Sequence, residues 1–490
     1  MEFAITLDQQ SAVPLHRQLY DEMRRAILSG RLRPGERVPS TRALARSLRV
    51  SRTTVTQGYD QLLSEGYLQA VVGSGTTVCT HLPDDLARPL PVAQASARRP
   101  APAFRLSDYG RSLAEAESFA LPEPEPLINF KTGRPAFDHF PLRLWRRLML
   151  RHLRHSEAAL LDYAGSSQGY EPLREAIAGY LRRSRAAHCE AGQIIIVSGS
   201  QQALDLTARL LINRGDLVAV EDPGYLGARR AFLAQGARLL PVPVDAAGII
   251  VERLKAQKNR PAAKLLYVTP SHQFPTGAVL SLPRRIELLA WAEASGALII
   301  EDDYDSEFRY DSRPIPALQG LARSDTVIYA GTFSKVLAPG LRIGYLVVPP
   351  SLAPLFTQAR WLADRHSALL EQRVLTDFIT EGHLERHLRR MRVLYDQRRQ
   401  ALVRALEQHF ADRVQILGEN AGLHLMIRLR TRLSAAEVVA RAASAGVGLL
   451  SAQASYLRAD PKAEFILGYS SLSERRIREG IRRLASVITK

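Results

Sequence analysis

Lys335 is the residue of this sequence with the clearest potential for covalent chemistry. It ends the segment GTFSK, residues 331–335, which directly follows a short run expected to form a strand. Open α/β sheets bind ligands beyond the carboxyl ends of their strands, and an amine held there can form a Schiff base with an aldehyde. Thr332 offers a hydroxyl to a phosphate, and Arg342 could bind that phosphate through two hydrogen bonds. The competing interpretation is a surface lysine in a loop, which one short motif does not exclude.

Four acidic residues fall within the five positions of the segment EDDYD, residues 301–305, which also follows an expected strand. Carboxylates this close repel one another, so a partner should neutralise some of them. One such partner is a pyridine ring, whose protonated nitrogen a carboxylate would stabilise while a nearby tyrosine bonds the ring hydroxyl. The other is magnesium, because clustered carboxylates suit hard cations. The acidic segment by itself leaves these two alternatives open.

A third segment, SGSQQ at residues 198–202, lies between an expected strand and an expected helix at 203–211. A Gly-Ser turn at a helix N-terminus presents free N–H groups to an anion. This segment is a weak signal alone, but it shares its position after a strand with the lysine and the acidic segments. The three together indicate one ligand site.

The region from residue 127 to the end alternates short Val/Ile-rich strands with longer amphipathic helices. This alternation predicts an α/β fold with a mainly parallel sheet and helices on both faces. The clearest strands are 194–197, 217–220, 264–268, 297–300 and 326–329.

The first 80 residues predict a different domain, with three helices and a hairpin. Ser40 can cap a second helix over 41–48, and Ser51 can cap a third over 52–63, followed by two short strands around 73–75. Arg52 and the threonines after it suit insertion into the major groove of DNA. A three-helix interaction module that binds no nucleic acid is the alternative.

Residues 81–126 contain eight prolines and predict an extended, semi-rigid linker between a domain at 1–80 and a domain at 127–490. The net charge of +17 fits a nucleic-acid partner, although an arginine-rich proteome would give the same value. Two cysteines, Cys79 and Cys189, provide no disulfide framework or cysteine-rich zinc site. With no apolar run long enough to span a bilayer and no signal peptide at the start, we expect a cytoplasmic protein without a membrane partner.

The N-terminal segment PLHRQLYDEMRRAILSGRLRPGERVPSTRALARSLRVSRTTVTQGYDQLLSEGYL resembles the GntR-type winged helix-turn-helix over nearly its whole length. Such modules bind double-stranded DNA as dimers on paired half-sites. The resemblance implies that these residues contact DNA: Arg42, Ser51, Arg52, Thr53, Thr56 and the wing from Gly73 to Gly75.

Residues 127–490 resemble the fold-type I, class I/II aminotransferases. The motifs are DYAGSSQGYEPLREAIAGYL, VSGSQQALDL, VEDPGY, VTPSHQFPTG, IIEDDYDSEFRY and YAGTFSKVLAPGLRIGY. The resemblance implies pyridoxal 5′-phosphate as cofactor, a small C-terminal α+β subdomain and a homodimer. It assigns Lys335 to the Schiff base, Asp302 to the pyridine nitrogen and Tyr304 to the ring hydroxyl. It also places Ser200, Gln201, Thr332 and Arg342 at the phosphate, Tyr225 near the ring face, and Tyr163 at the phosphate of the partner subunit.

Both resemblances in one chain make it similar to MocR/GabR-type regulators. Two positions depart from the aminotransferase pattern. Phe274 stands where an asparagine binds the ring hydroxyl, and Ile466 stands where an arginine binds the substrate carboxylate, with Arg458 as a possible substitute. These departures favour a sensor without net turnover over an aminotransferase that carries a DNA-binding domain, which is the alternative. The expected effector is an amine, an amino acid or pyridoxal phosphate itself, and the missing arginine favours the last.

Overall fold

The computed structural model describes residues 5–71, 75–84, 105–115, 126–154, 162–163, 165–256, 262–310, 315–458 and 463–488. The chain divides into two compact units, Met1–Arg105 and Leu106–Lys490. Among the described residues, the apolar core of the first unit shares no member with the cores of the second. Each unit therefore buries its own apolar surface.

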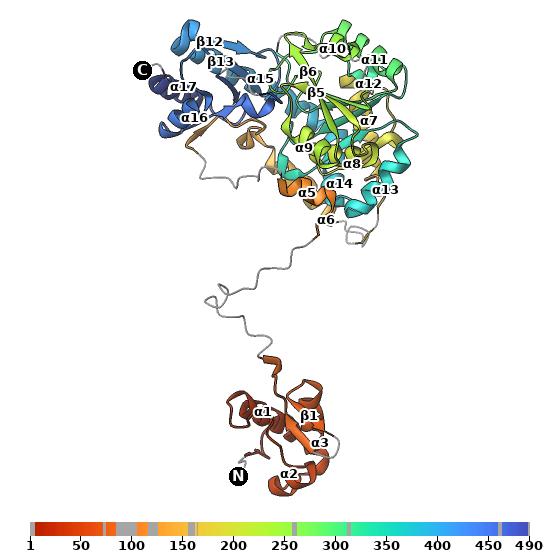
Figure 1. The fold of residues 1–490 in the computed structure, drawn as a ribbon, viewed down its shortest axis with the longest axis vertical. Coiled ribbons are helices and arrows are strands. Elements are labelled where there is room, and N and C mark those ends of the chain that lie inside the picture. Colours follow the sequence, from red (N-terminus) through yellow and green to blue (C-terminus); the bar gives the residue numbers. More distant parts are fainter. Residues whose placement is uncertain are drawn as a thin grey trace. The chain divides into compact units, whose positions relative to one another are not determined.

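The first unit consists of three helices and a two-stranded hairpin, as the sequence predicts (Figure 1). Its core joins Leu19 of the first helix and Val55 of the third to Val78 of the hairpin. Ser40 and Ser51 cap the second and third helices, because each side chain accepts a backbone N–H from the first turn. The elements are α1 (Leu15–Leu28), α2 (Thr41–Leu48), α3 (Arg52–Ser64), β1 (Leu68–Val71) and β2 (Gly75–Val78).

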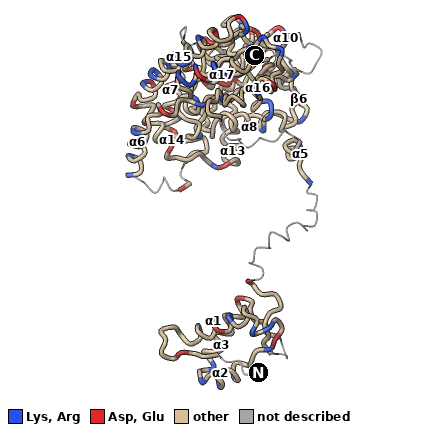
Figure 2. Tube along the Cα trace, turned by 90° about the vertical axis from the view of Figure 1, so that its left-hand side faces the viewer, with Lys and Arg blue, Asp and Glu red and all other residues tan. Residues whose placement is uncertain are grey.

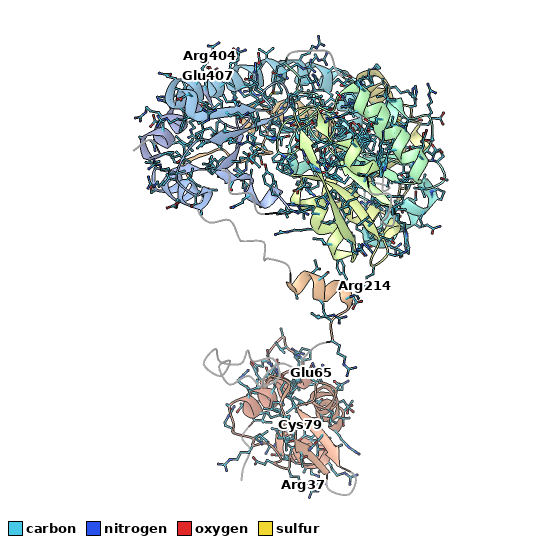
Figure 3. The ribbon with its side chains drawn as sticks, turned by 45° about the horizontal axis from the view of Figure 1, so that its top comes forward. Arg37, Glu65, Cys79, Arg214, Arg404 and Glu407 are labelled. Atoms are coloured by element: carbon cyan, nitrogen blue, oxygen red, sulfur yellow. The ribbon has the colours of Figure 1, made fainter. Side chains whose placement is uncertain are left out.

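The hairpin forms the wing. Its strands pair antiparallel, with Leu68 opposite Val78 and Val71 opposite Gly75. Arg37 adds a further bridge to Thr77, and Figure 3 labels this residue in the first unit. Of the predicted wing residues, Gly73 lies outside the described residues, whereas Gly75 has a φ of 86° and is exposed. The glycine therefore suits a left-handed turn position that other residues rarely adopt.

The expected extended linker is wrong over Asp108–Glu115, where the chain forms helix α5. This stretch contains no proline, and Ser107 accepts the N–H of Gly110 at 3.0 Å at its start. The helix contacts α9 (Leu226–Ala234), and Asp108 forms an ion pair with Arg214 (Figure 3). The prolines on either side dominated the sequence pattern and concealed one amphipathic helix between them.

The second unit is built on an eight-stranded sheet in which six strands run in one direction and β11 and β7 run in the other. The mainly parallel α/β sheet is therefore confirmed. The strands in spatial order are β4 (Ile194–Val197), β11 (Gly344–Val347), β10 (Val327–Thr332), β9 (Leu298–Asp303), β8 (Leu265–Val268), β5 (Leu217–Asp222), β6 (Arg238–Asp245) and β7 (Gly248–Ile249).

Helices cover both faces of this sheet (Figure 1). On β4, Ile194 and Ile196 pack with residues of α7 and α14, whereas Ile195 and Val197 pack with residues of α8 and α13. Successive side chains of a strand point to opposite faces, so a strand covered on both sides is apolar throughout. The helices are α6 (Leu142–Arg154), α7 (Glu171–Arg185), α8 (Ser200–Leu211), α9, α10 (Val251–Lys255), α11 (Leu282–Ser295), α12 (Leu318–Leu321), α13 (Ala353–Asp364) and α14 (Leu369–Thr380).

A smaller α+β subdomain completes the second unit, as the resemblance implies. Its antiparallel sheet has the order β12 (Val414–Leu417), β13 (His424–Leu429), β16 (Glu464–Gly468), β15 (Leu450–Ser451). A separate parallel pair joins β14 (Val447–Gly448) to β3 (Ile128–Asn129). A segment from early in the second unit therefore packs with the small C-terminal subdomain. The helices are α15 (His383–Phe410), α16 (Ala435–Ser444) and α17 (Glu474–Ile488). None of the helices in the described part of the chain is long and apolar enough to cross a membrane.

Candidate cofactor site and nucleic-acid interface

A cavity of about 270 Å³ lies at the carboxyl ends of β8, β9 and β10, beside the start of the small subdomain. Parallel strands end at the same edge of a sheet, which brings segments far apart in the sequence together. Eight of the nine residues predicted for the cofactor line this cavity: Lys335, Asp302, Tyr304, Ser200, Gln201, Thr332, Arg342 and Tyr225. The three sequence segments therefore do form one site.

The amine of Lys335 donates a hydrogen bond to the carbonyl of Gly133 at 3.0 Å. Burial lowers the pKa of this amine, against the opposing effect of Asp305 and Asp302. A lower pKa increases the neutral fraction, which is the nucleophilic form that attacks an aldehyde. The site thus holds an activated amine in a fixed position.

Asp302 provides an acceptor that has no partner of its own. One carboxyl oxygen accepts the hydroxyl of Tyr267 at 2.8 Å, while the other, Oδ1, is buried without a hydrogen bond. Burial raises the pKa of Asp302 to about 6. An unsatisfied buried acceptor is costly, so this oxygen is suited to a donor such as a protonated pyridine nitrogen.

The opposite end of the cavity suits a phosphate. Helix α8 begins at Ser200 directly after Gly199, whose φ is 99°, and its first residues, Ser200 and Gln201, line the cavity. The first turn of a helix has free backbone N–H groups that suit an anion. Arg342 reaches the same place and donates to the carbonyl of Ser198. Thr332 donates its hydroxyl to Ser334 at 3.0 Å, and both line the cavity. A dianionic group would meet N–H groups, hydroxyls and a guanidinium here.

Aromatic rings form the wall between these two ends. Phe274 meets Tyr225 edge-on with ring centroids 5.8 Å apart, and it meets His424 at 5.4 Å. Tyr304 donates its hydroxyl to the carbonyl of His272 at 2.8 Å and stacks with His424 at 6.5 Å. Phe274, where aminotransferases carry an asparagine, therefore contributes an aromatic ring and no hydrogen bond from its side chain.

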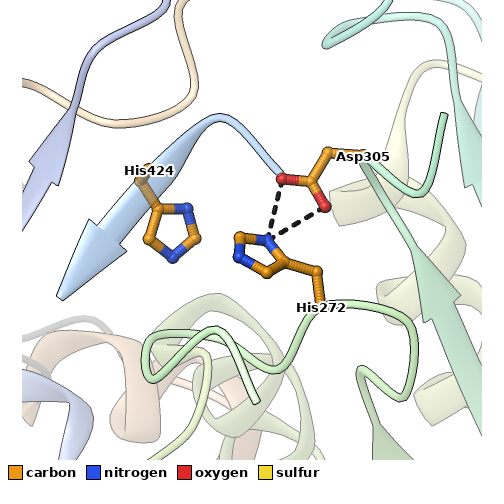
Figure 4. A group of neighbouring side chains, drawn as sticks. All are labelled: His272, Asp305 and His424. Atoms are coloured by element: carbon orange, nitrogen blue, oxygen red, sulfur yellow. Dashed lines mark hydrogen bonds and ion pairs between the residues drawn. The ribbon is translucent and has the colours of Figure 1, made fainter. Parts of the chain in front are cut away.

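His272, Asp305 and His424 form a buried group at this wall, and Asp305 and His424 line the cavity (Figure 4). Nδ1 of His272 is 3.0 Å from the carboxylate of Asp305, which also accepts the N–H of Leu423. Nε2 of His424 lies 3.3 Å from the carbonyl of Pro275, and burial together with His272 holds the pKa of His424 well below its usual value. Imidazoles and a carboxylate within 4.8 Å of one another are metal-ligand types, but most of their atoms already have protein partners here.

The four acidic residues of the segment at 301–305 do not converge on one point. Glu301 accepts the backbone N–H groups of Leu318 and Gln319, and Asp303 pairs with Arg185 at 2.7 Å. Asp302 and Asp305 have the separate partners described above. Because the carboxylates face different groups, the geometry favours the pyridine interpretation over a shared magnesium ion.

Tyr163 is the ninth predicted residue, and it does not line the cavity of its own chain. Its side chain is 77 % exposed and lies under the guanidinium of Arg365. This placement is compatible with a contribution to a partner subunit, which stays a prediction.

Ile466 lies in an apolar cluster with Met426 and Ala452, against which Phe274 and Tyr456 pack. Arg458 is exposed and is not among the described residues that line the cavity. The structure therefore gives no support to Arg458 as a substitute for the missing arginine. At the position where aminotransferases have an arginine that binds the substrate carboxylate, this chain has an apolar cluster.

Several lining residues were not identified from the sequence: Thr132, Gly133, Tyr267, Asp305, Leu423 and His424. Asp305 belongs to the acidic segment that was recognised, and Tyr267 belongs to an expected strand. The others come from loops or strand starts of the small subdomain, for which no local pattern indicates a role.

The predicted DNA contacts lie on α2, on the start of α3 and on the wing. Arg42, Arg52 and Thr53 are exposed, and Thr56 is partly exposed one turn further along α3. Figure 2 marks the arginines of α2 in blue. Ser51 is exposed as well, but its hydroxyl accepts the N–H of Thr54 at 3.0 Å. The capping of α3 therefore explains why a serine stands at position 51, whether or not its side chain also contacts DNA.

The first unit is a winged helix-turn-helix, and the second has the fold and the cavity of a pyridoxal-phosphate-dependent aminotransferase. Residues 15–78 match the bacterial regulatory proteins of the gntR family, and residues 125–482 match the aminotransferase class I and II family. The chain is thus built as a DNA-binding regulator with an aminotransferase-type domain.

Similar proteins share this arrangement along the whole chain. The chain is 42% identical to "Probable rhizopine catabolism regulatory protein MocR" of Rhizobium meliloti, covering 98% of this chain and 95% of the relative. It is 34% identical to the pyridoxine biosynthesis transcriptional regulator PdxR of Corynebacterium glutamicum, covering 87% and 86%. A crystal structure of α-aminoadipate aminotransferase LysN from Thermus thermophilus, with N-(5'-phosphopyridoxyl)-L-leucine, matches with a TM-score of 0.69 and 32% identity, covering 74% and 92%. The chain belongs to the MocR-type family of transcriptional regulators, and its cofactor is pyridoxal 5′-phosphate.

Gly133 is required beside the reactive amine. An added Cβ would lie 2.6 Å from Nζ of Lys335, at a φ of 77° that side-chain-bearing residues rarely adopt. We expect Gly133→Ala to weaken binding of pyridoxal phosphate at least about tenfold, because the added Cβ would displace the amine of Lys335. Fluorescence titration with the cofactor measures this. Gly340→Ala, at a cavity-side turn with open space around it, is the control and should bind normally; equal affinities would contradict the expectation.

Proposed function

We propose that this protein regulates transcription in the cytoplasm by coupling the state of a pyridoxal phosphate on Lys335 to operator binding by the winged helix. The observation that carries the proposal is the cavity. It is lined by the amine of Lys335, whose pKa is lowered, by Asp302, which has a carboxylate oxygen without a partner, and by the residues suited to bind a phosphate. When bound, the cofactor supplies an aldehyde for amines and an electron-withdrawing ring. The residues of the chain bind and orient that group.

The positions of the side chains support the following roles. Lys335 would bond to the aldehyde carbon, and Asp302 would accept a hydrogen bond from the ring nitrogen. Tyr304, which donates to the carbonyl of His272, would accept a hydrogen bond from the ring hydroxyl. Tyr225 would lie near the ring face. Ser200, Gln201, Thr332 and Arg342 would hold the phosphate.

The same proposal places Arg42, Ser51, Arg52, Thr53, Thr56 and Gly75 at DNA. Arginine reads guanine edges in the major groove, and hydroxyls and glycine backbone contact phosphates. The protein acts as a homodimer on two half-sites, with Tyr163 contributing to the cofactor phosphate of the partner subunit. The exposed position of Tyr163, outside the cavity of its own chain, supports this arrangement.

The effector acts in the cavity, either as an amine or amino acid that meets the cofactor or as pyridoxal phosphate whose occupancy is the signal. Either ligand changes DNA affinity only by binding two dimer conformations unequally. A gel shift on the DNA upstream of the protein's own gene, with and without pyridoxal phosphate and candidate amines, tests the proposal. We expect a shift whose midpoint changes with cofactor. Multiple-turnover transfer of an amino group to a keto acid, with no shift, would instead favour an aminotransferase.

The charge of Asp302 should make cofactor binding depend on pH. The carboxylate is ionised above its pKa of about 6 and neutral below it, so the ionic bond to a protonated ring nitrogen weakens as pH falls through 6. At pH 7.5 we expect Asp302→Asn to lower cofactor affinity about 10- to 100-fold, the value of a charge-assisted hydrogen bond. Equilibrium dialysis at pH 5 and pH 7.5 measures both effects. Between those pH values the variant should change less than the unchanged protein, and a steeper change would argue against this role.

A further inference from the structure

The cavity selects among ligands by the charges on its wall. Among the described residues that line it, the positively charged side chains are Lys335 and Arg342. Lys335 bonds to the cofactor under the proposed function. Arg342 donates to the carbonyl of Ser198 and lies against Gly199 at the anion end. Neither is available to a carboxylate placed next to a reacting amine.

The third basic group on the wall, His424, cannot supply the missing charge. It is 3 % exposed, and burial keeps its pKa well below the usual value, so the imidazole is neutral near pH 7. Beside it, Asp305 lines the same cavity, and its carboxylate lies 3.0 Å from Nδ1 of His272 and accepts the N–H of Leu423. An anionic substituent would therefore meet a neutral ring and an acidic residue, and neither supplies a positive charge.

Position 466, where aminotransferases bind the substrate carboxylate, is apolar, and so is the residue between it and the cavity. Phe274 forms the cavity surface, and behind it Ile466 packs with Met426 and Ala452. Ile466 is 1 % exposed. A carboxylate buried against this wall would lose its water without gaining a partner, and such a loss is among the largest penalties in binding.

A cationic amine, by contrast, finds suitable surroundings. Tyr225, Phe274 and Tyr304 line the cavity, and the electron-rich face of such a ring attracts a positive charge. Asp305 adds an acidic group within the same wall. Among the described residues that line the cavity, no positively charged side chain is left for a carboxylate, whereas aromatic and acidic residues suit an ammonium group. Both observations point to the same ligand class.

We propose that the cavity binds a primary amine whose amine-bearing carbon carries no carboxylate. This inference rests on the proposed function, because it names the class of effector that meets the cofactor on Lys335. The isoleucine at position 466, where the aminotransferase pattern has an arginine, then marks a different ligand class.

Matched pairs that differ by one carboxylate test the proposal directly. The full-length protein, saturated with pyridoxal phosphate, is titrated calorimetrically with ethanolamine and serine, tyramine and tyrosine, histamine and histidine, and agmatine and arginine. We expect at least one amine to bind and its amino-acid counterpart to bind at least about 100-fold more weakly, which equals about 2.8 kcal/mol. An amino acid that binds as tightly as its amine overturns the proposal.

The outcomes also separate this inference from the function on which it rests. If pyridoxal phosphate attaches to Lys335 and changes DNA binding, but no amine of the panel binds, the inference is overturned and the regulator remains. If the cofactor does not attach to Lys335, the proposed function itself fails.

A reversal of the preference provides a second test. Phe274→Asn together with Ile466→Arg opens the wall and introduces a guanidinium behind it, so we expect the amino-acid member of each pair to gain at least about tenfold relative to the amine. Ile466→Met keeps the wall apolar and should leave the ratio unchanged. The visible absorption of bound cofactor shows that each variant is folded. An unchanged ratio in a cofactor-loaded double variant contradicts the assignment.

Discussion

Lys335→Ala should abolish covalent attachment of pyridoxal phosphate. After saturation with the cofactor and reduction with borohydride, the unchanged protein is expected to carry a pyridoxyl group on the peptide containing position 335, and the variant none. The reason is local: Lys335 is the only lysine among the described residues that line the cavity, and its lowered pKa favours the attacking form. Intact mass followed by peptide mapping measures the adduct.

A lysine outside the cavity provides the control for this experiment. Lys264 is paired with Asp216 at 2.8 Å at the start of β8, so Lys264→Ala should retain the full adduct. We also expect the DNA affinity of Lys335→Ala to be indifferent to added pyridoxal phosphate. An adduct that persists in this variant, or that maps to another lysine, would remove the basis of the proposed function.

Arg52→Ala should reduce operator affinity about 10- to 100-fold, because a bidentate arginine–guanine contact contributes about 1–3 kcal/mol. Arg52 is exposed at the first position of α3, after the cap at Ser51, so its loss should leave the fold intact. Fluorescence anisotropy with the upstream DNA at several salt concentrations measures affinity. Binding should weaken with salt in both proteins, because phosphate contacts release counterions.

The matched control is Arg25→Ala on α1, an exposed arginine paired with Glu22 at 2.5 Å. It removes the same charge from the same unit without touching α2 or α3. We expect its affinity to change by less than threefold. If Arg25→Ala and Arg52→Ala weaken binding equally, net charge and not base contact would account for the effect.

Local sequence patterns predicted the elements well where one periodicity dominates. The buried strand Ile194–Val197 and the helix Thr41–Leu48 have the predicted bounds. Strands β9 and β10 extend three residues further than expected, through Asp303 and Thr332. Their last residues are polar but remain paired, since Asp302 lies opposite Ala330 and Asp303 opposite Gly331. The apolar run of each strand ends before its backbone pairing does, and residues of the polar ends, Asp302 and Thr332, line the cavity.

The parts of the site that sequence missed depend on tertiary contacts. His424 starts a strand of the small subdomain, and only the fold brings it within 4.7 Å of the ring of His272. Gly133 follows the strand pair that joins the two ends of the second unit, and its carbonyl contacts Lys335 from 202 residues away. Neither position has a neighbour in sequence that reveals its role. Helix α5 was missed for a different reason, because flanking prolines outweighed a short amphipathic pattern.

The separate cores of the two units have an evolutionary consequence. The described buried apolar residues of the first unit form one core with one another, so this core includes no residue of the sensor domain that follows. Recombination could therefore join another DNA-binding domain to the same sensor domain, or another sensor domain to the same DNA-binding domain, without changes in either hydrophobic core. New combinations of target genes and metabolites would then arise by exchange of whole modules, with point mutations refining them afterwards.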